Sequence, residues 1–114
     1  MASSRNADAA FFILLSLSSG PLHGYAIRKT VEELSHGRTR LGTGTLYGAI
    51  KRFLDLGWIT PVPRAGAPSK ETTRTRREYA LAAAGRKELA REVERITSLR
   101  EAAVRTGVLK PSRA

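Results

Sequence analysis

The side chains of this sequence are suited to binding phosphate and not to breaking covalent bonds. Lys and Arg number 20 against 10 Asp and Glu, a formal net charge of +10. An excess of this size attracts polyanions, above all nucleic acid, and as a second choice the acidic face of a membrane. A solvated basic surface without such a partner is the alternative that charge alone leaves open.

The groupings that catalysis requires are missing from the sequence. It shows no paired carboxylates, no Ser/His/Asp grouping and no glycine-rich phosphate loop in a suitable context, and Asp8 and Asp55 are the only aspartates. His23 and His36 are too few for a metal site, and there is no cysteine. We therefore expect no enzyme, no metal and no cofactor.

Apolar periodicity predicts the helices that carry the basic residues. A first helix begins at the N-cap Asn6 and ends before Gly20. A second amphipathic helix spans 22–35, with Ile27, Val31 and Leu34 as its apolar stripe.

A third helix is capped by Thr43 and ended by Gly57. Its inward stripe is Leu46, Ile50, Phe53 and Leu54.

The rest of the chain reads as a hairpin followed by one long helix. Alternation predicts strands over 58–62 and 78–81, joined by a Gly/Pro/Ser/Thr-rich basic loop over 64–76. The predicted fold is mainly α with a small β-hairpin, a winged helix-turn-helix over 6–81. A C-terminal dimerisation helix over 82–105 and a disordered tail over 106–114 follow. The longest apolar stretch, Ala9–Leu17, is too short to span a bilayer, so we expect a soluble cytoplasmic (nucleoid-associated) protein without membrane contact.

Six blocks of the sequence resemble one family, the PadR-like transcriptional regulators. They are Gly20–Tyr25, Leu41–Tyr47, Lys51–Leu54, Gly57–Ile59, Arg76–Leu81 and Gly85. The resemblance covers about Phe11 to Leu99. It implies a bacterial repressor or sensor, dimerised through the C-terminal helix with help from the first. Palindromic DNA would be bound by the third helix and the wing. The chain departs from the family's pattern at Gly48, where proline is usual, and at Ala82, where a capping threonine is usual.

DNA-facing residues are expected opposite the apolar stripe of the third helix and at the start of the second. On the third helix, a merely solvated polar face is the alternative. His23 and Tyr25 are candidate phosphate contacts, although Tyr25 could instead pack against the third helix. The wing loop would add affinity through its cations. The candidates on the third helix are Thr43, Thr45, Tyr47, Lys51 and Arg52, and those on the wing are Arg64, Lys70, Arg74, Arg76 and Arg77.

The long helix has an apolar stripe with too little remaining chain to cover it. A second subunit is the expected cover, and a helix folded back over its own core is the alternative. The dimerisation residues are Leu89, Val93, Ile96, Leu99 and Ala103. Some PadR-like proteins hold planar aromatic effectors between subunits, which suggests a pocket formed by Phe11, Phe12 and Leu99. A winged helix that binds only protein is the alternative function.

Overall fold

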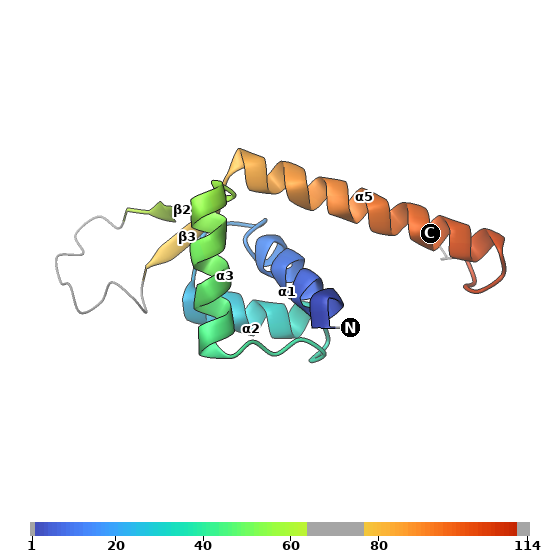
Figure 1. The fold of residues 1–114 in the computed structure, drawn as a ribbon, viewed down its shortest axis with the longest axis horizontal. Helices are drawn as coiled ribbons and strands as arrows, with labels where there is room; N and C mark the ends of the chain where they lie inside the picture. Colours follow the sequence, from blue (N-terminus) through green and yellow to red (C-terminus); the bar gives the residue numbers. More distant parts are fainter. Residues whose placement is uncertain (1, 64–76, 112–114) are drawn as a thin grey trace.

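Three helices pack together as the body of the molecule, and a fourth helix, called the rod below, extends away from them (Figure 1). The computed structural model describes residues 2–63 and 77–111, with side chains from Asp8 onward. The body contains α1 (Ala2–Ser16), α2 (Gly24–Leu34) and α3 (Thr43–Leu56), and the rod is α5 (Ala83–Arg105). Since α1 packs against both α2 and α5, it is the central helix of the body.

A three-stranded antiparallel sheet flanks the helices. Its strands are β1 (Leu22–His23), β2 (Ile59–Val62) and β3 (Glu78–Leu81), in the order β1-β3-β2. The predicted hairpin is β2 and β3, which pair from Ile59–Leu81 to Val62–Glu78. The prediction that residues 22 and 23 are helical is wrong, because their backbone pairs with Tyr79 and Glu78.

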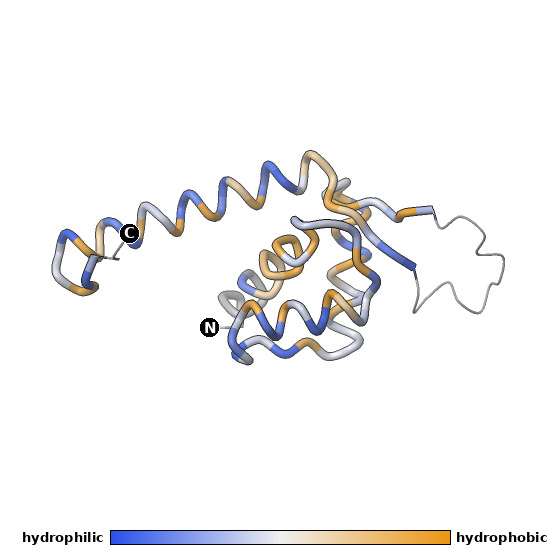
Figure 2. Tube along the Cα trace, turned by 180° about the vertical axis from the view of Figure 1, so that it is seen from behind, coloured by the Kyte–Doolittle hydropathy of each residue, from blue (hydrophilic) through white to orange (hydrophobic). Residues whose placement is uncertain are grey.

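The apolar stripes of the helices meet in one core (Figure 2). The predicted stripe of α3 is confirmed. The predicted stripe of α2 is buried except at Leu34, which is partly exposed. Ser16, at the end of α1, is buried and donates its hydroxyl to the carbonyl oxygen of Ile13 at 2.6 Å, so the core contains no unsatisfied hydroxyl there. The most deeply buried side chains are Ile13, Leu14, Leu17, Ile27, Val31, Leu46 and Ile59.

Two further predicted helix starts, those of α1 and α3, are also wrong. Helix α1 begins at Ala2, so Asn6 lies inside it and does not cap it. Helix α3 has Gly42 at its N-cap position and begins with Thr43, and no side chain caps it. The predicted end of α3 is confirmed, since Gly57 has φ 77° and its left-handed conformation closes the last turn.

Helix α5 starts from the sheet and then leaves the body. The N–H of Ala82 donates to the carbonyl of Trp58 at 2.9 Å, and no side chain caps the helix. Leu89 is buried against the core, whereas Val93, Ile96 and Leu99 are exposed. The helix therefore does not fold back over its own core (Figure 1). No helix in the described part of the chain is long and apolar enough to cross a membrane.

The C-terminal end of α5 is closed by its own backbone. Gly107 has φ 86°, and the N–H groups of Val108 and Leu109 both donate to the carbonyl of Ala103, at 2.9 and 3.1 Å. This left-handed glycine closure is a common helix ending. Disorder was predicted for the whole tail over 106–114; residues 106–109 are hydrogen-bonded in this closure, whereas residues 112–114 lie outside the described part.

Candidate nucleic-acid interface

Helix α3 presents a polar and basic face to solvent. Leu46, Ile50 and Phe53 anchor it in the core. A period of 3.6 residues turns the other side outward, and Thr43, Thr45, Lys51 and Arg52 are all exposed there. Because no side chain caps this helix, the N–H groups of its first turn are available to an anion, and the helix dipole favours a phosphate at this position.

Two glycines make the outer face of α3 unusually bare. A Cβ built at Gly44 or Gly48 would meet nothing within 4 Å. The fold therefore does not require glycine at either position, although glycine in a helix interior costs about 1 kcal/mol relative to alanine. The bare face allows a ligand to approach the α3 backbone closely.

Tyr47 lies between α2 and α3 and does not point fully outward. It is half-buried, and a Cβ at Gly24 would collide with its hydroxyl. Gly24 thus allows the start of α2 to lie directly against the ring of Tyr47. The hydroxyl of Tyr79 lies nearby in the core: burial raises its pKa, Arg77 opposes this shift and Tyr47 adds to it. A contact of Tyr47 with DNA stays a prediction, and its packing against Gly24 was not predicted from the sequence.

The start of α2 is organised by His23 and Tyr25. His23 is the N-cap residue, and its Nδ1 accepts a hydrogen bond from the N–H of Ala26 at 3.3 Å. Tyr25 is 66% exposed, and its ring stacks on that of His23 with centroids 6.4 Å apart. This exposure favours a solvent-facing role for Tyr25 over packing against α3.

The exposed face of α2 extends this region with two further cations. Arg28 and Lys29 follow Tyr25 by three and four residues, so the three side chains share one face of the helix. Neither cation was predicted from the sequence as a DNA contact, although their spacing from Tyr25 was the available signal. Glu32 and Glu33 lie on the same surface, so its positive charge is confined to the first half of α2.

The sheet places the base of the wing beside α2. His23 pairs with Glu78 and Val62 pairs with Glu78 from the other side, so β3 lies between the start of α2 and β2. Arg77, at the base, is exposed. The other predicted wing contacts, Arg64, Lys70, Arg74 and Arg76, lie outside the described residues.

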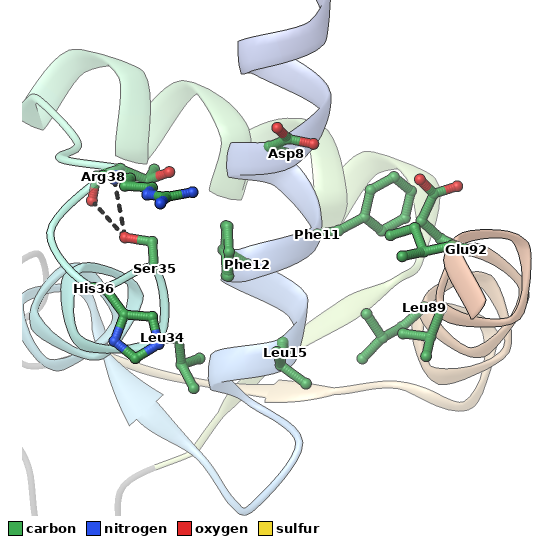
Figure 3. Close-up of a pocket in the computed structure, with 13 residues that line it drawn as sticks. Asp8, Phe11, Phe12, Leu15, Leu34, Ser35, His36, Arg38, Leu89 and Glu92 are labelled. Carbon is green, nitrogen blue, oxygen red and sulfur yellow. Dashed lines mark hydrogen bonds between the residues drawn. The ribbon is translucent and has the colours of Figure 1, made fainter. Parts of the chain in front are cut away.

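A cavity of about 490 Å³ lies on the other side of the body, between α1, the end of α2 and α5 (Figure 3). Phe11 and Phe12 line it, as the sequence suggested. Leu99 is not among the lining residues, because it lies beyond Ile96, the last residue of α5 at the cavity. Asp8, Glu92 and Arg38 supply charge at its edges. The described residues contain no cluster of side chains suited to a metal ion.

Replacing His23 by Ala should lower the free energy of unfolding by about 1 kcal/mol, the usual effect of deleting an N-cap acceptor. His23→Asn is the matched control, because asparagine offers an acceptor at the same position and should remain within a few tenths of a kcal/mol of the wild type. Urea denaturation followed by the fluorescence of Trp58, the single tryptophan, measures both. Equal losses in the two variants would show that the hydrogen bond to Ala26 is not what His23 contributes.

Three helices followed by the antiparallel pair β2 and β3, with an exposed basic third helix, define a winged helix-turn-helix protein. The sequence model of the transcriptional regulator PadR-like family matches residues 13–91. The chain belongs to this family, which confirms the resemblance stated above. This is a family of transcriptional regulators, and membership of it confirms the prediction that the chain is not an enzyme.

This chain is similar to known proteins in sequence and in structure. In sequence, the chain is 37% identical over 95 residues to an uncharacterized 37.1 kDa protein in transposon TN4556 of Streptomyces fradiae, and the match spans 83% of this chain and 25% of that protein. The chain thus covers about a quarter of the length of this curated relative. A transcriptional regulator structure from Clostridium thermocellum superposes with a TM-score of 0.72 at 22% identity, covering 96% of this chain and 98% of that one.

A second similar structure contains DNA. Bacillus subtilis PadR in complex with operator DNA superposes with a TM-score of 0.61 at 24% identity, over 74% of this chain and 45% of that one. At this identity the similarity establishes the fold.

Proposed function

We propose that this protein is a homodimeric repressor that binds a dyad-symmetric DNA operator, with α3 in the major groove and the wing along the sugar-phosphate backbone. The observation that carries the proposal is the outer face of α3, where exposed threonines and cations surround a bare backbone. Membership of a family of transcriptional regulators supports it. Such a protein works at the nucleoid, in the cytoplasm.

The residues divide into base-reading and backbone-positioning groups. On α3, Lys51 and Arg52 have the reach and charge for guanine edges or phosphates, and Thr45 can bond to either. On α2, Tyr25, Arg28 and Lys29 are suited to phosphates, because this helix crosses the backbone in helix-turn-helix proteins. The wing cations would contribute affinity more than sequence choice.

The exposed stripe of α5 supports the dimer. Val93, Ile96 and Leu99 face solvent along the part of α5 that has left the body. A two-fold partner that presents the same stripe would cover them and place two α3 helices on one duplex. Occupancy of the operator by this dimer is how repression would arise.

The cavity beside α1 supports a response to a small aromatic effector. Phe11 and Phe12 offer ring surfaces there, and Leu89 and Val93 supply aliphatic walls. Apolar walls with a few charged groups at the edge are typical of small-molecule sites. A planar aromatic compound bound there would contact α1 and α5 together, and so would alter how the dimer holds its α3 helices.

Fluorescence anisotropy tests the proposal. The protein is titrated against the duplex upstream of its own gene, half of that site, and an unrelated duplex, each at two salt concentrations. We expect two chains per full site, at least about 10³-fold preference over the unrelated duplex, and affinity that falls steeply with salt. Equal binding to all three duplexes would show that the basic charge of the protein attracts DNA without sequence specificity. It would also favour the winged helix that binds only protein.

A further inference from the structure

The segment that leads into α3 carries two cations followed by an exposed hydroxyl. Arg38 and Arg40 precede Thr43 by five and three residues, and all three residues are exposed. Among the serines and threonines of the sequence, Thr43 alone has arginine at both of these positions. Protein kinases select their substrates by charge patterns of this kind, because carboxylates beside the active site pair with cations at fixed distances from the accepting hydroxyl.

The backbone before Thr43 is held in place and yet presents this residue to solvent. Residues 39–42 form neither helix nor strand, and Gly42 has an extended conformation with φ −73° and ψ 160°. The N–H of Thr39 donates to the hydroxyl oxygen of Ser35 at 2.9 Å, and Leu41 is buried. After Leu41 the chain is exposed over 42–45, so an enzyme can reach Thr43 without displacing a core side chain.

The first turn of α3 can open at low cost. No side chain caps it, and Thr43 lies between Gly42 and Gly44, although glycine favours helix less than any residue except proline. A Cβ at Gly44 would meet nothing within 4 Å, so the core does not hold this turn in place. The hydroxyl of Thr43 makes no hydrogen bond to another described residue, so none has to break when the turn opens.

Ser98 provides a comparison within the same chain. It is exposed, and Arg95 precedes it by three residues. However, Ser98 lies inside α5, where opening the backbone breaks helical hydrogen bonds on both sides. In addition, Arg95 already donates two hydrogen bonds to Glu92, at 3.0 and 2.7 Å. We therefore expect Ser98 to be a much poorer kinase substrate than Thr43.

A phosphoryl group on Thr43 would reverse the charge of the face that the proposed function places on DNA. It carries a charge of about −1.5 to −2 at pH 7. Within the protein this charge is favourable, because it lies at the N-terminus of α3, where the helix dipole attracts anions. Beside a duplex the same charge is repelled by the phosphates of the DNA backbone. The modified protein should therefore stay folded and lose its affinity for DNA.

We infer that Thr43 is the phosphorylation site of a protein kinase that prefers arginine three and five residues before the hydroxyl, and that phosphorylation releases the protein from DNA. The hydroxyl oxygen of Thr43 forms a bond to the γ-phosphorus of ATP. The bond from this phosphorus to the bridging oxygen breaks, ADP leaves with the electron pair, and the hydroxyl proton passes to a base of the kinase. The modification is independent of the proposed function, whereas release from DNA rests on it.

A purified kinase with this arginine preference, supplied with ATP and Mg²⁺, tests the site on the full chain. Tandem mass spectrometry of tryptic peptides should find phosphate on Thr43 and little on Ser98. Arg40→Ala should slow the reaction at least about tenfold, the usual effect of losing one charge-assisted contact. Folding should not change, because Arg40 is paired only with Glu32, at 4.0 Å on the surface.

The matched control is Arg91→Ala, which removes an exposed arginine of α5 and should leave the rate of phosphorylation unchanged. Equal slowing by the two substitutions would show that the kinase responds to net charge alone, and this overturns the site. Phosphate on other residues and none on Thr43 overturns it as well.

Anisotropy with the duplex upstream of the protein's own gene tests the release from DNA. At low salt the phosphorylated protein should bind at least about 100-fold more weakly than the unmodified protein. The loss should shrink at high salt, because salt screens the repulsion. Thr43→Glu should weaken binding in the same salt-dependent way, and Thr43→Gln, which adds no charge, measures the effect of losing the hydroxyl.

The outcomes separate this inference from the proposed function. Equal operator affinity before and after phosphorylation of Thr43 overturns the release from DNA. A lower melting temperature of the phosphorylated protein would show that the modification unfolds α3, and this overturns the electrostatic account. An unmodified protein that binds operator and unrelated duplex equally overturns the proposed function instead, while phosphate on Thr43 in that protein still supports the kinase site.

Discussion

Gly85→Ala is expected to lower the free energy of unfolding by about 3 kcal/mol, near the upper end of the usual effect of overpacking. A Cβ at this position would overlap the carbonyl oxygen of Trp58, which is main chain and cannot rotate away. The same carbonyl accepts the N–H of Ala82 at 2.9 Å. Relief of the overlap would move the first turn of α5 away from the sheet and expose Leu89, which is buried.

Gly48→Ala is the matched control for this prediction. A Cβ there meets nothing within 4 Å, so the substitution should raise the free energy of unfolding by about 1 kcal/mol through helix propensity. Chemical denaturation at one fixed protein concentration, followed by Trp58 fluorescence, measures both changes. Stabilisation by both substitutions would mean that α5 can shift off Trp58 at little cost, and the tight contact at Gly85 would then be wrong.

The double substitution Lys51→Ala with Arg52→Ala should weaken operator binding by about 100-fold or more at low salt. Each cation is exposed on α3, and a bidentate contact to a base accounts for about 1–3 kcal/mol. Where the lost contacts are to phosphates, the slope of log affinity against log salt should fall by about 0.9 for each. The free energy of unfolding should change by less than about 0.5 kcal/mol, because neither side chain packs in the core.

The control for this variant removes the same charge elsewhere. Lys87 and Arg91 are exposed on α5, and the ion pair of Arg91 with Glu88, at 3.5 Å, lies at the surface and contributes little. Lys87→Ala with Arg91→Ala should reduce operator binding by less than about threefold, through the loss of net charge alone. Anisotropy titrations of both variants at two salt concentrations separate the cases. Similar losses in both would show that α3 does not read the operator.

Local patterns were sufficient to predict most of the fold. The stripe through Leu46, Ile50 and Phe53 identified the buried side of α3, and its outer face followed from the helical period. Gly57 was a reliable stop, because its left-handed conformation is a local property. The strand Glu78–Leu81 was also predicted with its observed bounds.

Pairings between distant segments account for what the sequence could not predict. Residues 22 and 23 fit the amphipathic pattern of α2, but they pair with β3, more than fifty positions later. Tyr47 fell on the predicted outer face, whereas the crossing of α2 over α3 places its ring against Gly24. Leu34 belongs to the predicted apolar stripe of α2, but its side chain lines the cavity beside α1 and is not part of the core.

The pairing of the short strand β1 with β3 affects how the start of α2 and the base of the wing respond to DNA. An isolated two-stranded hairpin is marginally stable in water, but here β3 is held on both sides, by β2 and by the residue that caps α2. The wing base and the first turn of α2 therefore form one mechanical unit. Immobilising that unit on a duplex costs conformational entropy once, so phosphate contacts at Tyr25 and at Arg77 should reinforce each other and not simply add.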